Sequence, residues 1–128
     1  MAARPTILII EDNPNNLRIM ERSLERSDYA IIHAGDGAEG LDMAYSHKPD
    51  LILLDLGLPD VDGQTVAARL KQDPAMQHIP LVVVTAWPSE TAAQMVAAYG
   101  CEGYISKPID TRQFPAQVAA YLAQSGHA

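Results

Sequence analysis

Five short apolar runs, each four or five residues long, alternate along the chain with longer segments of mixed polarity. The runs are TILII (6–10), YAIIH (29–33), LILL (51–54), LVVVT (81–85) and GYIS (103–106). Their length, their β-branched and leucine content and the turn-forming residues around them are typical of buried β-strands. Strands that alternate with helices build a parallel sheet, because each helix returns the chain to the same edge. The order of the segments therefore predicts an α/β fold.

The segments between these runs have the residue spacing of helices. Leu17, Met20 and Leu24 fall on one face of a helix predicted over 15–26, with charged residues around the rest. Further helices are predicted over about 38–46, 63–72, 89–99 and 111–124.

Residues that commonly end or cap helices occur at most of these predicted helix ends. Asp73-Pro74 and Gly100 are suitable ends for the third and fourth helices, and Asp110 can cap the fifth. Pro115 lacks the N–H that a helix interior needs, so we expect the fifth helix to begin distorted or late.

Right-handed crossovers would place these helices on both faces of the sheet, in three layers. For five strand–helix units we expect the doubly wound, flavodoxin-like strand order 2-1-3-4-5. The chain has 128 residues, so we expect a single domain over 1–128 with its core at about 6–124. Ligands of such sheets bind beyond the carboxyl ends of the strands, where the winding reverses between strands one and three.

Polar and charged residues stand at these carboxyl ends. Asp55 directly follows the apolar run LILL, and the loop after it contains Gly57, Pro59 and Gly63. The other strand-end residues are Glu11, Asp12, Thr85 and Lys107. The fold would bring all of them to one edge of the sheet, although they span most of the sequence.

This group of residues has the chemistry of a phosphoryl site. Three crowded carboxylates repel one another, and a divalent cation with oxygen ligands, such as Mg²⁺, compensates them. A lysine supplies positive charge to a phosphoryl group, and a threonine hydroxyl supplies a hydrogen bond. The residues therefore indicate a phosphoryl group attached to a carboxylate.

In this order, the motifs resemble those of the response-regulator receiver domain family. The resemblance covers the full length of the chain and rests on Glu11-Asp12-Asn13, LLDLGLPDVDG (53–63), Thr85-Ala86 and Lys107-Pro108. Each motif alone is common by chance, but together, each at a predicted strand end, they are typical of the family. With no effector domain after the fifth helix, the chain looks like the stand-alone, CheY-like or DivK-like members, or like a receiver taken from a hybrid kinase.

The resemblance implies a role for each site residue. Asp55 would be the phosphoacceptor, a nucleophile that takes a phosphoryl group from a phosphohistidine. Mg²⁺, or Mn²⁺ in its place, would be held by Glu11, Asp12, Asp55 and the backbone carbonyl of Gly57. The charge of the transferred group would be stabilised by Lys107, Thr85 and Ala86.

The resemblance also implies a switch. Thr85 would move toward the phosphoryl group and Tyr104 would turn inward, changing the surface of the fourth helix, fifth strand and fifth helix. The bond before Pro108 resembles the family's cis-proline. Such a protein assists its own phosphorylation and dephosphorylation but is otherwise not an enzyme.

The implied partners are proteins. The phosphoryl donor would be a histidine kinase or a histidine phosphotransfer protein, and the target that reads the switch is not identified by the sequence. We expect a monomer, or a weak dimer that depends on phosphorylation.

Composition argues against some other partners and some cellular compartments. The net charge of −7 argues against nucleic acid or an anionic membrane as the main partner. The apolar runs are too short for membrane insertion. The single cysteine, Cys101, cannot form an intrachain disulfide, which fits a reducing compartment, and we expect the cytoplasm.

Two positions near the expected site depart from the common family pattern. Gly57, two residues after Asp55, is often a larger residue in the family, and Trp87 is a bulky aromatic two residues after Thr85. Gly57 could admit water to an acyl phosphate, whereas Trp87 could shield it.

Plainer interpretations stay open for single residues. Asp12 can be a loop or helix-cap residue, and Tyr104 a packed strand aromatic. The basic row on the first helix, formed by Arg18, Arg22 and Arg26, can be a solvated face or can contribute to kinase docking.

Three rival functions share parts of the pattern. A haloacid dehalogenase phosphatase also uses a nucleophilic aspartate with Mg²⁺, but it normally carries a second aspartate where this chain has Gly57. A flavin or nucleotide carrier needs a glycine-rich or hydroxyl-rich loop after the first strand, where this chain has EDNPNN. A receiver-like module that works without phosphorylation would typically have lost Asp55, Asp12 or Lys107.

Overall fold

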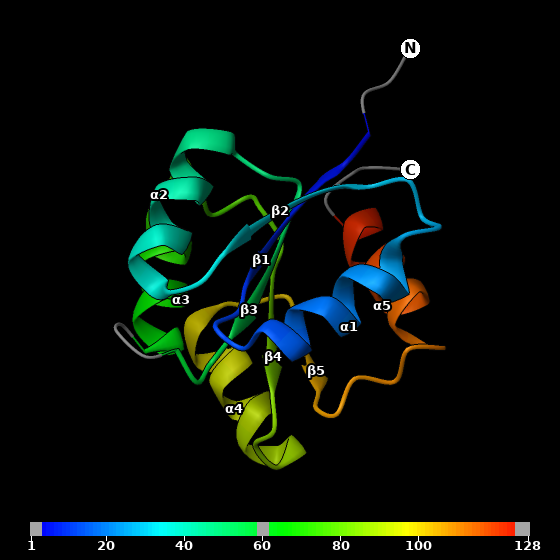
Figure 1. Ribbon diagram of the computed structural model, residues 1–128. Helices are drawn as coiled ribbons and strands as arrows, with labels where there is room; N and C mark the ends of the chain where they lie inside the picture. Colours follow the sequence, from blue (N-terminus) through cyan, green and yellow to red (C-terminus); the bar gives the residue numbers. More distant parts are fainter. Residues whose placement is uncertain (1–3, 59–61, 125–128) are drawn as a thin grey trace.

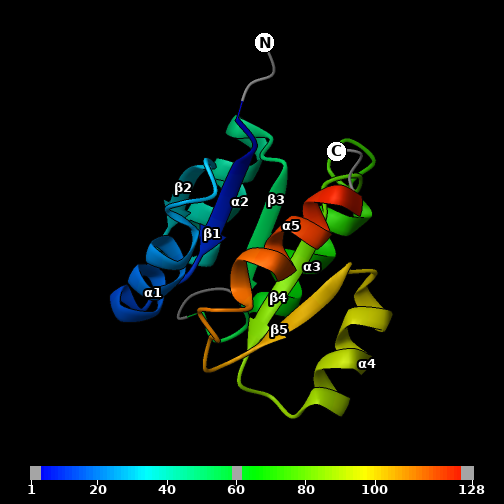
Figure 2. The ribbon, with the colours of Figure 1, turned by 90° about the vertical axis from the view of Figure 1, so that its right-hand side faces the viewer.

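The computed structural model describes residues 4–58 and 62–124, so Pro59 lies outside the described residues. Within them, five parallel strands form one sheet in the order β2-β1-β3-β4-β5, which confirms the predicted topology. The strands are β1 (Thr6–Ile10), β2 (Ala30–Ala34), β3 (Leu51–Asp55), β4 (Leu81–Thr85) and β5 (Gly103–Ser106). Figure 2 shows β2 and β5 at the two edges of the sheet.

The helices between the strands are α1 (Pro14–Leu24), α2 (Gly37–His47), α3 (Gly63–Gln72), α4 (Ser89–Tyr99) and α5 (Phe114–Gln124). Figure 1 shows α1 and α5 on one face of the sheet and α2 and α3 on the other. Met95 of α4 packs in the same cluster as α2 and α3, which completes the three layers. No helix within the described ranges is long and apolar enough to cross a bilayer.

Alternate residues of each central strand point to opposite faces of the sheet. In β3, Ile52 and Leu54 pack with α2, α3 and α4, whereas Leu51 and Leu53 pack with α1 and α5. Every residue of β3 is buried. Full burial of one such side chain contributes about 1.5–3 kcal/mol, so the strand is firmly fixed and holds Asp55 at its end.

Several predicted boundaries were wrong by one or two residues. The second strand starts at Ala30 instead of Tyr29, because Ala30 is the residue that pairs with Thr6 of β1. The first helix starts at Pro14, because Asn13 is the cap: its Oδ1 accepts the N–H groups of the next two non-proline residues. That helix ends at Leu24, two residues before the predicted end.

The fifth helix starts late, as Pro115 indicated, at Phe114 instead of the predicted Thr111. A turn comes first, in which the Asp110 carbonyl accepts the N–H groups of Gln113 (3.1 Å) and Phe114 (2.9 Å). Asp110 Oδ1 also accepts the N–H of Arg112, so Asp110 caps this turn. Pro115 then falls in the first helical turn, where its missing N–H does no harm.

A buried lysine connects three segments at the amino edge of the sheet. Lys71 Nζ donates to the carbonyl oxygens of Gln77 (3.0 Å) and Ile79 (2.8 Å), and it lies 2.6 Å from Glu102 Oε1. Glu102 Oε1 also accepts the N–H of Leu81 at 2.6 Å. These contacts join the end of α3 to the segments that precede β4 and β5, and all three donors of the ammonium group have acceptors.

We predict that Lys71→Ala lowers the free energy of unfolding by about 2–4 kcal/mol, because two carbonyl groups and a carboxylate lose their shared donor. Urea unfolding followed by circular dichroism measures this change. Arg69→Ala, at an exposed position of the same helix, is the control. A loss for Lys71→Ala no larger than that for Arg69→Ala would contradict the stabilising role.

Candidate functional site

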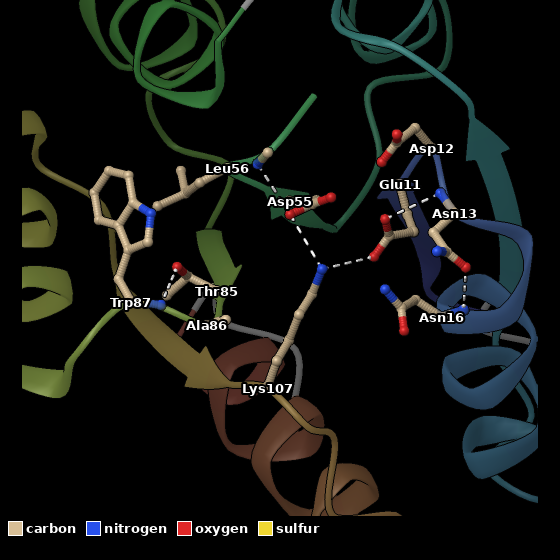
Figure 3. A pocket seen from close by; sticks show the side chains of 11 residues that line it. Glu11, Asp12, Asn13, Asn16, Asp55, Leu56, Thr85, Ala86, Trp87 and Lys107 are labelled. Atoms are coloured by element: carbon tan, nitrogen blue, oxygen red, sulfur yellow. Dashed lines mark hydrogen bonds and ion pairs between the residues drawn. The ribbon is translucent and has the colours of Figure 1, made fainter. Parts of the chain in front are cut away.

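The predicted strand-end residues meet in one pocket at the carboxyl edge of the sheet. Asp55 is the last residue of β3 and Thr85 the last of β4, while Glu11 and Lys107 directly follow β1 and β5. The pocket is lined by these four and by Asp12, Asn13, Asn16, Leu56, Gly57, Ala86 and Trp87. Figure 3 shows the Lys107 side chain reaching between the carboxyl groups of Asp55 and Glu11.

Asp55 is a buried carboxylate with two donors at one oxygen. Its side-chain oxygen Oδ1 accepts hydrogen bonds from the Gly57 N–H (3.1 Å) and from Lys107 Nζ (3.2 Å). Burial opposes ionisation, but hydrogen bonds from Glu11, Gly57 and Lys107 outweigh it, so the pKa of Asp55 is held below its ordinary value. Asp55 is therefore a buried carboxylate that the surrounding donors hold in its ionised form.

Glu11 has the opposite electrostatic character. The residue is 1% exposed, and burial, followed by the hydrogen bond with Asp55, raises the pKa of its carboxyl group to about 7. Oε2 accepts the Asn13 N–H at 3.2 Å, and Oε1 lies 3.3 Å from Lys107 Nζ. The distance suits an ion pair, yet Oε1 has no hydrogen-bond partner among the described residues. A buried acceptor without a donor is an available metal ligand.

Asp12 is exposed and completes an acidic group. Glu11, Asp12 and Asp55 each offer a carboxylate oxygen, and these three atoms lie within 4.8 Å of one another. Hard divalent cations prefer such oxygen ligands, and the buried, unpartnered Oε1 of Glu11 fits the same conclusion. Gly57 lines the pocket and its N–H is used by Asp55, while its carbonyl as a metal ligand stays a prediction.

Lys107 and Thr85 form the opposite wall of the pocket. Burial opposes the lysine charge, but Asp55 and Glu11 more than compensate, so the pKa of Lys107 is raised and its ammonium group is charged. The Lys107 N–H donates to the Thr85 carbonyl at 2.8 Å, which fixes the position of the lysine backbone. Thr85 is 2% exposed and its Oγ1 accepts the Trp87 N–H at 2.9 Å. The peptide bond between Lys107 and Pro108 is cis, as predicted.

Gly57 and Trp87 both border the pocket. A Cβ atom at Gly57 would meet only Asp55 Oδ1, at 3.7 Å, so the backbone there would accept a larger residue. Trp87 is half-buried and packs against the same core cluster as Leu56. Figure 3 shows its indole beside Leu56, on the side of the pocket away from α1. The site is thus open beside Gly57 and covered beside Trp87.

The structure does not bring Tyr104 into the pocket. Tyr104 is half-buried on β5 and packs against the core cluster shared by α2, α3 and α4. It lines a separate hollow with Ser106, Pro108 and Gln117.

Sequence reasoning missed three lining residues: Asn13, Asn16 and Leu56. Asn13 could have been found, since asparagine before proline is a good helix start. Leu56 also had a signal, because it directly follows Asp55 in the sequence. Asn16 has no comparable signal, because its place depends on how α1 is turned about its axis.

Comparisons with known proteins agree on one family. The model of the response regulator receiver domain matches residues 7–119. The polar-differentiation response regulator DivK of Brucella anthropi is 39% identical over 120 residues, covering 94% of this chain and 98% of that protein.

Solved structures agree. A two-component response regulator from Clostridium difficile has a TM-score of 0.86 and 26% identity, covering 97% of this chain and 100% of that one. The Mn²⁺-bound form of the response regulator Rcp1 has a TM-score of 0.81 and 27% identity, covering 92% and 94%.

These matches do not favour the phosphatase, the nucleotide carrier or the module that works without phosphorylation. The family model spans most of the chain, and a relative of 39% identity is matched over nearly its whole length. The chain therefore belongs to the response regulator receiver domain family and is a receiver of two-component phosphorelay signalling.

Proposed function

We propose that Asp55 is the phosphoacceptor of this receiver. The observation that carries the proposal is the contact of a buried, ionised carboxylate with Lys107 Nζ at 3.2 Å, inside a pocket that holds two further acids. A carboxylate held in this way can attack phosphorus and form an acyl phosphate.

We also propose that Glu11, Asp12, Asp55 and the carbonyl of Gly57 hold Mg²⁺, with Mn²⁺ as a substitute. The acidic group among the described residues and the Mn²⁺-bound form of the related Rcp1 support this assignment. When bound, the cation would neutralise the acids and draw charge from the phosphoryl oxygens.

The protein's own groups would then stabilise the transferred phosphoryl. Lys107 would exchange part of its contact with Asp55 for a phosphoryl oxygen, which the length of its side chain permits. The Thr85 hydroxyl and the Ala86 N–H would donate to the other oxygens. Receivers are signalling proteins and not classical enzymes, and here these groups would assist both the gain and the loss of the phosphoryl group.

The same contacts would carry the switch. Thr85 Oγ1 now accepts the Trp87 N–H, and its own proton would be drawn toward the phosphoryl group. A shift at Thr85 reaches β5 through the Lys107 N–H, which donates to the Thr85 carbonyl. Tyr104, three residues before Lys107, would turn inward and change the surface of α4, β5 and α5 that a target protein reads.

The donor would be a histidine kinase or a histidine phosphotransfer protein that approaches beside α1. Asn16 brings α1 to the pocket, and the exposed face of that helix carries Arg18, Ile19 and Arg22. Ile19 is 40% exposed, and an apolar residue between two arginines is a suitable docking patch.

Incubation with acetyl phosphate and Mg²⁺ should add one phosphoryl group, about 80 Da by intact mass, to the wild type but not to Asp55→Asn. Removing the cation with EDTA should suppress the gain. Asp42→Asn, at an exposed position on α2, is the matched control and should be labelled like the wild type. Equal labelling of Asp55→Asn would contradict the assignment.

The two residues beside the pocket should have opposite effects on phosphoryl lifetime. Trp87→Ala should shorten the half-life by about threefold or more, because the indole no longer covers one side, and Gly57→Leu should lengthen it by filling the open side. The decay of the 80 Da increment after removal of free acetyl phosphate measures the lifetime, a mass gain of about that size being one phosphoryl group. Unchanged decay in both variants would remove these residues from the mechanism.

Reversing the charge of Arg18 and Arg22 together to glutamate should slow transfer from a phosphorylated histidine phosphotransfer protein by about tenfold, with no change for acetyl phosphate. Arg69→Glu, on the opposite face of the sheet, is the control. If the double variant and the control accept the phosphoryl group at the same rate, the arginines of α1 form a solvated face and do not contribute to docking.

A further inference from the structure

Among the described residues that line the pocket, Asn16 alone belongs to α1, and neither the metal nor the phosphoryl contacts proposed above use it. It is half-buried, and Figure 3 shows its side chain directed from α1 into the pocket, across from Trp87. Its backbone N–H is already bonded to Asn13 Oδ1 at 3.2 Å. Its side-chain amide has no hydrogen bond to another described residue.

The neighbouring Asn15 shows that this orientation is specific. Asn15 is the same residue type on the same turn, and its N–H also bonds to Asn13 Oδ1, at 2.8 Å. Asn15 is exposed and does not line the pocket. The backbone N–H groups of both residues therefore make the same contact with the cap, and the two residues differ only in the direction of the side chain.

The place of Asn16 suits one particular group of the reaction. Phosphoryl transfer is roughly in line, so the group that leaves or attacks lies on the far side of phosphorus from Asp55. Lys107 and Thr85 lie on the β4–β5 side of the pocket, and Asn16 lies on the α1 side. Because Asp55 is buried, an in-line group would lie on the more open side of the pocket, where the amide of Asn16 can donate and accept.

We propose that the side-chain amide of Asn16 positions the in-line group, which is the leaving group when Asp55 is phosphorylated and the attacking water when the phosphoryl group is lost. The inference deepens the proposed function and rests on it.

The same contact of the Asn16 amide with the in-line group would serve both phosphorylation and hydrolysis. In phosphorylation by a phosphohistidine protonated on its second ring nitrogen, the P–N bond breaks, its electron pair stays on nitrogen, and a P–O bond forms to Asp55; neutral imidazole leaves. In hydrolysis, a water oxygen bonds to phosphorus, and the P–O bond to Asp55 breaks with its electron pair on the carboxylate. The water proton passes to the phosphate released.

The test compares wild type, Asn16→Ala and Asn15→Ala as the full chain, with phosphoramidate as the donor and Mg²⁺ present. Three quantities are measured: the rate of phosphorylation and the rate of loss, both by intact mass, and the affinity for Mg²⁺ by calorimetry. Asn16→Ala should slow both rates by about five- to tenfold, the effect of one lost hydrogen bond. Its Mg²⁺ affinity and thermal unfolding should match those of Asn15→Ala, which should behave like the wild type.

Equal rates in Asn16→Ala and Asn15→Ala would overturn the inference and leave Asp55 as phosphoacceptor. A change in only one of the two rates, or a loss of Mg²⁺ affinity that accounts for the slower rates, would also overturn it. A wild type that gains no phosphoryl group would overturn the proposed function together with the inference.

Discussion

The contact of Lys107 with Asp55 and Glu11 is the interaction on which the site depends. Two buried carboxylates side by side are unfavourable, and one ammonium group 3.2 and 3.3 Å from them compensates both. The sheet order sets the distance that this side chain must cover, because β4 lies between β3 and β5. A long side chain such as that of lysine is needed to cover this distance.

The same contact leaves the site short of positive charge. One lysine lies among three acids, and burial together with the hydrogen bond to Asp55 raises the pKa of Glu11 to about 7, so Glu11 binds a proton more tightly than an ordinary carboxyl group does. A divalent cation at these oxygens would supply more positive charge than a proton does, and it suits such donors. Under the proposed function, such a site would be sensitive to the roughly two negative charges that a phosphoryl group brings, and Lys107 and Thr85 would be the groups that respond to them.

Much of this arrangement follows from the sequence. The short apolar runs, the helical spacing between them and the residue after each run were enough to predict the sheet and bring Glu11, Asp55 and Lys107 together. The ends of α1 and α5 were less predictable, because Asn13 and Asp110 compete with other polar residues as caps. The direction of Asn16 could not be predicted, since it follows from how Met20 and Leu24 pack α1 on the sheet. Which side chain of an exposed turn faces the pocket is a property of tertiary packing.

The two edges of the sheet use a lysine in opposite ways. At the amino edge, Lys71 has all its donors satisfied by two carbonyl groups and Glu102, and none of these needs to change during function. At the carboxyl edge, Lys107 contacts Asp55 and Glu11, and under the proposed function part of these contacts would pass to the phosphoryl group. Glu11 Oε1 has no hydrogen-bond partner in the part of the chain that the structure describes. Local conflict of this kind is expected where chemistry occurs, and it is tolerated because stability comes from elsewhere. In this fold the fully satisfied contacts of Lys71 and the buried strands stabilise the sheet, so its stability does not depend on the groups at the opposite edge to which the proposed function assigns the chemistry.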